Sequence, residues 1–253
     1  MQLNYRTYGN GFPLIILHGL FGSLENWQTV SRRLGEHFQV FAIDQRNHGG
    51  SPHSQIFNYE VMAGDLSEFM ETHGLARAHI LGHSLGGKTA MQFAFRHPEK
   101  VGKLIVVDIA PKAYPPGHLD IFKALFALDL TRFQNRKQME DTLADSIPEV
   151  SVRQFLLKNL MRDESGAFKW KLGLDEIRQN YDLINQALPK ESPFPGEALF
   201  IKGGRSDYIL ASDEGLIKEL FPRAMVTNIP DAGHWVHAEK LEEFVESALE
   251  FLL

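Results

Sequence analysis

The chain has 253 residues, of which 43% are hydrophobic and 23% charged, and it contains no cysteine. This length predicts one large domain or one domain with an insertion, and the lack of thiols excludes a disulfide scaffold, a Cys-liganded zinc site and a cysteine nucleophile. The 26 basic and 32 acidic residues give a net charge of -6, without the concentrated Lys and Arg that phosphate binding needs, so no nucleic-acid partner is expected.

The amino terminus and the longest apolar runs indicate where the protein works. No basic segment followed by a long apolar run opens the chain, so we expect no secretory signal. Uninterrupted apolar runs are short, such as Leu14 to Leu17, and a membrane span needs about 20 residues. We therefore predict a cytoplasmic protein without a membrane span; the oligomeric state stays open.

Seven short β-rich segments alternate with helical patterns along the chain. Several of the segments are almost continuously apolar, as expected for strands buried on both faces. The helical patterns at 58–72 and 85–96 each carry an apolar stripe. This alternation predicts an α/β fold with a mostly parallel sheet and helices on both faces. The expected strands are 2–8, 13–18, 38–44, 78–82, 103–108, 198–203 and 224–229.

The stretch 112–192 interrupts this alternation of strands and helices. It shows helical segments at 119–128, 136–145, 152–161 and 174–187, and no convincing strand. Roughly 80 residues without a strand exceed an ordinary crossover, so we predict a helical cap at 112–192 inserted into a core formed by 1–111 and 193–253. In open parallel sheets ligands bind beyond the carboxyl ends of the strands, where such an insertion forms a lid. The alternative is a plain run of sheet-covering helices. Prolines bound the stretch at Pro111, Pro115, Pro116, Pro189, Pro193 and Pro195.

The segment Gly82-His83-Ser84-Leu85-Gly86 matches the nucleophile elbow G-x-S-x-G. In this motif a strand ends, turns sharply and starts a helix, and glycines flank the serine because neighbouring backbones come too close for side chains. The turn exposes the Ser84 hydroxyl and leaves the amide of Leu85 at the amino end of the helix.

The same loop also satisfies a phosphate-loop pattern, with Gly82 followed by Gly87-Lys88-Thr89. The apolar segment before Asp108 even resembles a magnesium-binding strand of nucleotide hydrolases. A phosphate loop normally follows the first strand of its domain, however, and here it would follow a fourth or fifth. This nucleotide-binding alternative and a purely structural glycine-rich turn remain the minor interpretations.

Two further loops carry groups that a serine nucleophile needs. His18-Gly19-Leu20-Phe21 follows an early strand, where the second amide of an oxyanion hole is found; Leu20 is the first candidate and Phe21 its alternative. His234 follows the last strand and is a candidate general base. Asp108 and Asp207 both satisfy the chain order Ser…Asp…His.

These motifs together resemble the α/β-hydrolase superfamily, and most closely its branch of small bacterial carboxylesterases, related to mitochondrial abhydrolase-domain esterases. The resemblance spans nearly the whole chain and is weakest in the cap. It implies the α/β-hydrolase fold, a mostly parallel twisted sheet flanked by helices. The motifs are His18-Gly19-Leu20-Phe21-Gly22-Ser23, Asp44-Gln45-Arg46-Asn47-His48-Gly49, Gly82-His83-Ser84-Leu85-Gly86-Gly87-Lys88, Val107-Asp108-Ile109-Ala110-Pro111 and Gly233-His234-Trp235-Val236-His237-Ala238-Glu239-Lys240.

The resemblance bears on the acid that orients His234. The superfamily usually places its acid where Asp207 stands, whereas the resembling branch keeps the Asp-Ile-x-Pro element that begins at Asp108. We favour Asp108 and keep Asp207 as the alternative. A serine at the elbow argues against haloalkane dehalogenases and epoxide hydrolases, which use an aspartate nucleophile in this fold.

We therefore predict a serine hydrolase, a carboxylesterase or acyl thioesterase, that cleaves small to medium acyl substrates through an acyl-enzyme on Ser84. His234 would accept the proton, and the Leu20 and Leu85 amides would stabilise the oxyanion. No cofactor or metal is expected. One alternative is a carbon–carbon bond hydrolase or lyase with the same triad, which needs a cationic cluster; another is a binding module without turnover. Candidates for that cluster are Arg132, Arg136, Arg153 and Arg178.

Other conspicuous residues are expected to be structural. His79 and His83 straddle a strand and its turn, so they do not make a metal pair, and His83 is expected to pack or to donate hydrogen bonds. Arg46 and His48 should hold loops together, His237 should support the site, and Lys88 should be a cation on a helix surface. One or two of the cap aromatics should line the acyl site; they are Phe122, Phe126, Phe133, Phe155, Phe168 and Trp170.

Overall fold

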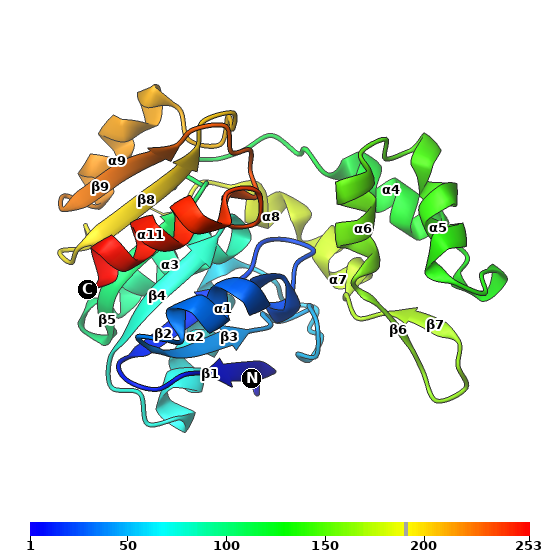
Figure 1. Ribbon diagram of the computed structural model, residues 1–253, viewed down its shortest axis with the longest axis horizontal. Coiled ribbons are helices and arrows are strands. Elements are labelled where there is room, and N and C mark those ends of the chain that lie inside the picture. Colours follow the sequence, from blue (N-terminus) through cyan, green and yellow to red (C-terminus); the bar gives the residue numbers. More distant parts are fainter. Residues whose placement is uncertain (190–191) are drawn as a thin grey trace.

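A computed structural model, which describes residues 1–189 and 192–253, builds the core around a seven-stranded sheet (Figure 1). The strand order is β1-β3-β2-β4-β5-β8-β9. β1 pairs antiparallel with β3, and the other neighbouring pairs are parallel. Each segment predicted to be a strand overlaps one strand of this sheet, although β5 begins two residues before its predicted segment and β4 ends one residue after its own. Their bounds are β1 Tyr5–Tyr8, β2 Pro13–Leu17, β3 Gln39–Ile43, β4 Ala78–His83, β5 Val101–Val107, β8 Ala198–Gly203 and β9 Ala224–Ile229.

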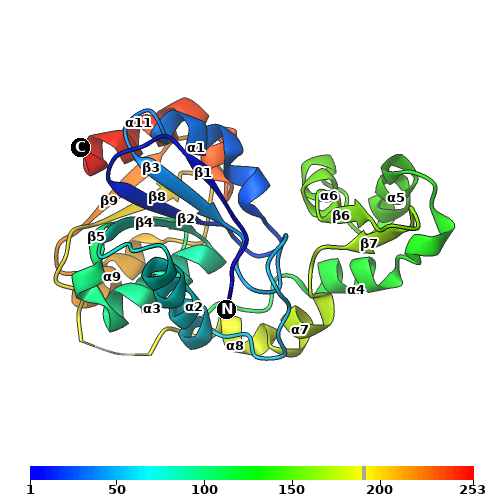
Figure 2. The ribbon, with the colours of Figure 1, turned by 90° about the horizontal axis from the view of Figure 1, so that it is seen from below.

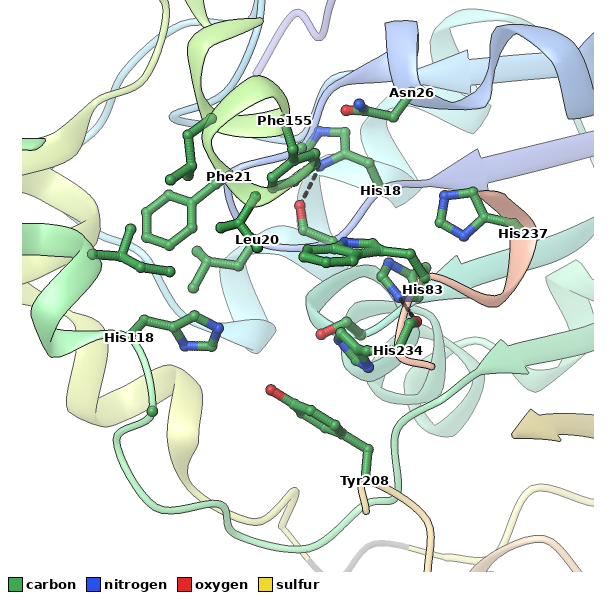
Figure 3. A pocket seen from close by; sticks show the side chains of 18 of the residues that line it. His18, Leu20, Phe21, Asn26, His83, His118, Phe155, Tyr208, His234 and His237 are labelled. Atoms are coloured by element: carbon green, nitrogen blue, oxygen red, sulfur yellow. Dashed lines mark hydrogen bonds between the residues drawn. The ribbon is translucent and has the colours of Figure 1, made fainter. Parts of the chain in front are cut away.

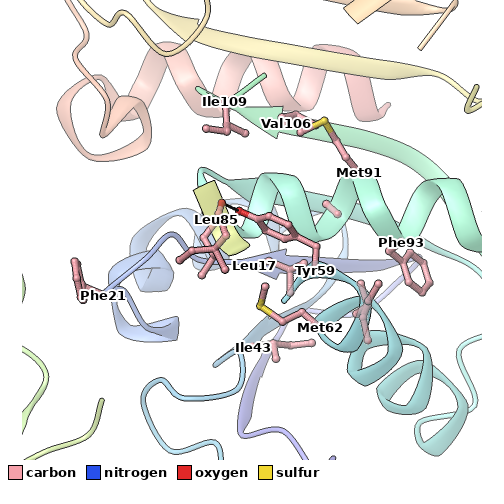
Figure 4. Packing of buried hydrophobic residues seen from close by; sticks show 14 of the residues in the cluster. Leu17, Phe21, Ile43, Tyr59, Met62, Leu85, Met91, Phe93, Val106 and Ile109 are labelled. Carbon is pink, nitrogen blue, oxygen red and sulfur yellow. Dashed lines mark hydrogen bonds between the residues drawn. The ribbon is translucent and has the colours of Figure 1, made fainter. Parts of the chain in front are cut away.

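Helices cover both faces of the sheet (Figure 2). Leu14 and Ile16 of β2 pack in the hydrophobic cluster that includes α1 and α11, whereas Ile15 and Leu17 pack in the cluster of α2, α3 and α9. This alternation follows from the two-residue period of a strand. Figure 4 shows part of the second cluster, where Leu17 lies near Met62 of α2 and Leu85 of α3. The bounds are α1 Gln28–Leu34, α2 Tyr59–Thr72, α3 Leu85–Arg96, α9 Glu214–Leu220, α10 Val236–Glu239 and α11 Leu241–Leu252.

The two helices predicted from their apolar stripes, α2 and α3, form almost where the sequence indicated. Asn58 caps α2, because its Oδ1 accepts a hydrogen bond of 3.0 Å from the Val61 N–H. α3 begins directly after Ser84. Within the described parts of the chain, no helix has the length and apolar character needed to cross a bilayer.

The stretch predicted as a helical cap contains helices and also a short antiparallel sheet, β6–β7. In Figure 1, α4 to α6 and this hairpin lie to one side of the main sheet. The expectation that 112–192 holds no strand is therefore wrong. α6 ends at Leu157, within the helical segment expected at 152–161, and a tight turn then joins β6 to β7, where Asp163 Oδ1 accepts from the Ala167 N–H and Gly166 adopts φ 83°. The bounds are α4 Leu119–Ala127, α5 Arg136–Thr142, α6 Val150–Leu157, β6 Leu160–Arg162, β7 Phe168–Trp170, α7 Leu174–Gln179 and α8 Tyr181–Asn185; residues 190 and 191 of the expected cap lie outside the described residues.

Candidate active site

Ser84 occupies a strained turn between β4 and α3. Its φ of 51° and ψ of −115° lie in a region that non-glycine residues rarely adopt. A Cβ atom at Gly82 would lie 2.2 Å from the carbonyl oxygen of Gly86, and one at Gly86 would lie 2.4 Å from that of Leu17. The two glycines are therefore required by close backbone approach, and the turn has the shape that the elbow motif predicts.

The loops that follow four parallel strands meet around Ser84, because the carboxyl ends of parallel strands lie at one edge of the sheet. Leu20 follows β2, Asp108 follows β5 and His234 follows β9. Ser84 and His234 line one cavity together with Leu20. Residues far apart in the chain thus come together at this edge.

Asp108 is the acid that contacts His234. The Nδ1 atom of His234 donates a hydrogen bond of 2.7 Å to Asp108 Oδ2, which leaves Nε2 of the neutral ring as an acceptor. Asp108 is fully buried, and its other oxygen, Oδ1, accepts from the Gly203 N–H over 3.0 Å. The Ser206 hydroxyl also donates to Oδ2. Asp207 is exposed, and among the described contacts none joins it to His234.

Two side chains fix the position of His234. The ring of Tyr208 stacks on the imidazole, with 3.9 Å between centroids, and its hydroxyl points into the cavity between His118 and His234 (Figure 3). His83 Nε2 donates to the main-chain oxygen of His234 over 2.9 Å, in line with the hydrogen-bonding role expected for it. Our sequence analysis missed Ser206 and Tyr208, although both flank Asp207 in the loop where an acid was sought.

The loop after β2 leaves the Leu20 amide as a candidate donor. The neighbouring Phe21 N–H donates to His48 Nε2 over 3.2 Å, so it is already paired. Burial lowers the pKa of His48 to about 3, which keeps the ring neutral and able to accept. The Leu85 N–H is the first of α3, where helical N–H groups have no partner within the helix. The carbonyl oxygen of Phe21 accepts from Asn159 Nδ2 over 2.7 Å.

A cavity of about 290 Å³ opens on Ser84. The main sheet and its loops contribute histidines and Trp27, and the segment predicted as a cap contributes apolar side chains that include Phe155 of α6. Among the other predicted cap aromatics, Phe122 is buried and Phe126 is 48% exposed. His237 lies at the edge of this cavity; it stacks on Trp27 at 3.9 Å, and burial lowers its pKa to about 3.

Lys88 is buried, which corrects the expectation of a cation on a helix surface. Its side chain is 1% exposed, and Nζ donates a hydrogen bond of 2.7 Å to the main-chain oxygen of Gln186. Desolvation lowers its pKa to about 7. The phosphate-loop interpretation is not supported, because the loop forms the strained Ser84 turn beside His234 and follows β4, not the first strand of the domain.

The arginines proposed as a cationic cluster serve other contacts. Arg153 Nη1 donates to the carbonyl oxygens of Ile147 and Pro148 at 2.7 Å each. Arg132 pairs with Asp129. None of the four candidate arginines is among the described residues that line the cavity beside Ser84, so these arginines do not support the carbon–carbon bond hydrolase.

Known proteins resemble this chain along nearly its whole length. The family model described as the alpha/beta hydrolase fold matches residues 13–241. The chain is 38% identical to the sn-1-specific diacylglycerol lipase ABHD11 of Mus musculus, over 94% of this chain and 80% of that protein. It is 33% identical to the esterase YbfF of Escherichia coli K12, over 100% of this chain and 99% of that protein. A solved structure of a marine microorganism esterase has a TM-score of 0.97 and 46% identity and covers 99% of both chains.

Proposed function

Because the chain belongs to the α/β-hydrolase family and is a carboxylic-ester hydrolase, we propose that it cleaves small to medium acyl esters or thioesters through an acyl-enzyme on Ser84. The observation that carries this proposal is the hydrogen bond from His234 to the buried Asp108 beside the strained Ser84 turn. Such a pair gives a serine the base that it needs to become a nucleophile.

In the proposed mechanism, Ser84 Oγ attacks the acyl carbonyl while His234 Nε2 takes its proton. Asp108 holds the ring with Nδ1 protonated and stabilises the imidazolium that forms. The amides of Leu20 and Leu85 donate to the oxyanion. His234 then gives the proton to the leaving alcohol or thiol, and water, activated by the same ring, releases the acid from Ser84.

The proposed cap, residues 112–192, forms part of the substrate pocket. Val152, Phe155 and Leu156 of α6 and Ile121 of α4 line the cavity, and apolar walls of this kind bind acyl or alkyl chains. A volume of about 290 Å³ suits a chain of moderate length. Turnover rates on p-nitrophenyl esters and acyl-CoA thioesters of increasing acyl length would measure the acyl-chain preference.

A serine-directed fluorophosphonate tests the nucleophile. We expect the reagent to label wild type at one serine and to leave Ser84→Ala unlabelled, with ester turnover lost in parallel. Ser165→Ala, in the exposed β6–β7 turn, is the matched control and should be labelled like wild type. Labelling of Ser84→Ala at the wild-type rate would contradict the proposal.

A further inference from the structure

A second, smaller chamber also opens on Ser84. Its volume is about 40 Å³, and it shares Ser84, Leu20, His118 and Tyr208 with the main cavity. An ester has two arms that diverge from its carbonyl carbon. When that carbon lies at Ser84, the longer arm can occupy the main cavity and a short arm the small chamber.

Lys88 gives the small chamber a positive charge with unused donors. An ammonium group has three N–H donors, and Nζ donates to one described protein acceptor, the main-chain oxygen of Gln186. The rings of Tyr59 and Tyr114 lie 5.5 and 5.1 Å from Nζ. The two tyrosine hydroxyls form hydrogen bonds with other groups, since Tyr59 donates to Ile184 O and Tyr114 donates to Tyr208 O.

His118 adds a second donor where the two chambers meet. The Tyr181 hydroxyl accepts from the His118 main-chain N–H over 2.9 Å, and it lies 2.7 Å from His118 Nδ1. Since that hydroxyl has its proton free to donate, Nδ1 is the acceptor and Nε2 carries the ring proton. The imidazole points into the space beside Tyr208 and His234 (Figure 3).

The described lining of the small chamber contains no Asp or Glu. A buried ammonium group without a counter-ion is costly, and an ion pair with hydrogen bonds offsets that cost. We propose that the small chamber binds a carboxylate at the end of the substrate's short arm, paired with Lys88, so that this enzyme prefers esters with an acidic short arm. This inference rests on the proposed function and specifies its substrate class.

The size of the small chamber sets the length of that arm. Ser84 and Lys88 both line it, and the Lys88 N–H donates to the Ser84 carbonyl oxygen over 3.0 Å, so the two residues lie one helical turn apart. A carboxylate separated by one or two carbons from the reacting ester suits a chamber of this size. A long or branched acidic arm would not fit a chamber of about 40 Å³.

Two pairs of substrates test the proposal and identify which arm is acidic. Hexyl hydrogen succinate carries the carboxylate on the acyl arm, and hexyl 4-methylpentanoate is its neutral match in shape. O-hexanoyl glycolate carries the carboxylate on the alcohol arm, and isobutyl hexanoate is its neutral match. We expect kcat/KM of one acidic ester to exceed that of its match by about 10- to 100-fold, as a charge-assisted hydrogen bond provides.

Two variants assign the preference to Lys88. Lys88→Met should lower the acidic-to-neutral ratio of kcat/KM to about one or below. Lys103→Met is the matched control, because Lys103 Nζ also donates to main-chain oxygens, those of Phe251 and Leu252, and also lies over an aromatic ring, but it is not among the described residues lining either chamber. It should keep the wild-type ratio.

The outcomes separate the two proposals. If wild type hydrolyses the neutral esters and prefers neither acidic ester, the proposal that the small chamber binds a carboxylate is wrong, whereas the proposed function stands. This measurement uses only the wild-type protein, so it does not depend on the folding of a variant. A preference that survives Lys88→Met also overturns it. If wild type hydrolyses none of the four esters and the fluorophosphonate does not label Ser84, the proposed function falls, and this inference falls with it.

Discussion

His234 Nδ1 donates to Asp108 Oδ2 over 2.7 Å, and Asp108 follows β5, whereas Asp207 follows β8. The two acids stand in neighbouring loops, because β5 and β8 are adjacent in the sheet. The loop after β8 nevertheless contributes to the pair, since the Gly203 N–H and the Ser206 hydroxyl both donate to the Asp108 carboxylate.

Replacement of each acid should separate their roles. Asp108→Asn offers His234 an amide in place of a carboxylate, so we expect kcat to fall by about 10⁴-fold, as when the analogous acid of a serine protease is replaced. Asp207→Asn should stay within a few-fold of wild type. Steady-state turnover of p-nitrophenyl butyrate measures both, and the reverse order would show that Asp207 orients the histidine.

The preference for acidic esters should depend on pH. Lys88 has a pKa of about 7 in the free enzyme because its ammonium is desolvated, and its charge is lost as the pH rises through that value. The groups around it stay neutral, since burial raises the pKa of Tyr59 and Tyr114 and lowers that of His118 to about 4. We expect the acidic-to-neutral ratio of kcat/KM to fall between pH 6 and 9. A flat ratio across this range would exclude an ion pair with Lys88.

The elbow should not tolerate a methyl group at Gly82. A Cβ there would overlap the Gly86 carbonyl at 2.2 Å, so Gly82→Ala should lower the free energy of unfolding by about 1–3 kcal/mol or more. Gly64 lies inside α2 with nothing within 4 Å of a Cβ, and Gly64→Ala should raise the stability by about 0.5–1 kcal/mol. Urea denaturation of both variants gives the comparison; equal effects would contradict the crowding at the elbow.

The ion pair between Arg46 and Asp65 should be important for stability. Arg46 Nε and Nη2 donate to the two carboxylate oxygens at 2.6 and 2.8 Å, and both residues are buried. Asp65→Asn leaves a buried guanidinium without its counter-charge, which costs about 3–5 kcal/mol. Arg33 and Glu242 form an exposed pair, and Glu242→Gln should change the stability far less, because water and salt screen such a pair. Thermal denaturation distinguishes the two.

Acid should destabilise the protein partly through His237. Burial lowers the pKa of His237 from 6.5 in the unfolded chain to about 3 in the folded protein. Below pH 6.5 this imidazole therefore binds a proton in the unfolded chain while it stays neutral in the folded one. Stability therefore falls with decreasing pH, by about 1.4 kcal/mol per unit between pH 6 and 4. His237→Phe keeps a ring against Trp27 and should remove that part of the slope. An unchanged slope in urea titrations at pH 7, 6 and 5 would show that the fold does not lower the pKa of His237.

The elements that were predicted well have strong local signals. α3 is expected at 85–96 and forms there, because Ser84 ends the strand before it and Pro98 follows it. The strands of the main sheet are apolar runs between turn residues. The short strands β6 and β7 carry no such run, and their one signal is the turn from Asp163 to Gly166.

The misplacement of Lys88 shows what local patterns cannot reveal. A charged residue in the first turns of a helix is normally solvated. Its burial depends on the carbonyl of Gln186, 98 residues later, and on rings from α2 and the segment before α4. The choice between Asp108 and Asp207 was open for the same reason, since both acids fit the chain order and the hydrogen bond to His234 is a tertiary contact.

Asn159 connects the segment predicted as a cap to the loop after β2, which carries the proposed oxyanion donor. Its side-chain amide donates a hydrogen bond to the carbonyl oxygen of Phe21, and the Phe21 N–H donates to His48 Nε2. Phe21 directly follows Leu20 in the chain. The Asn159 amide is therefore a direct polar link between the segment predicted as a cap and the peptide next to the proposed oxyanion donor. We expect a cap exchanged from another enzyme to need an equivalent amide to keep that peptide in place.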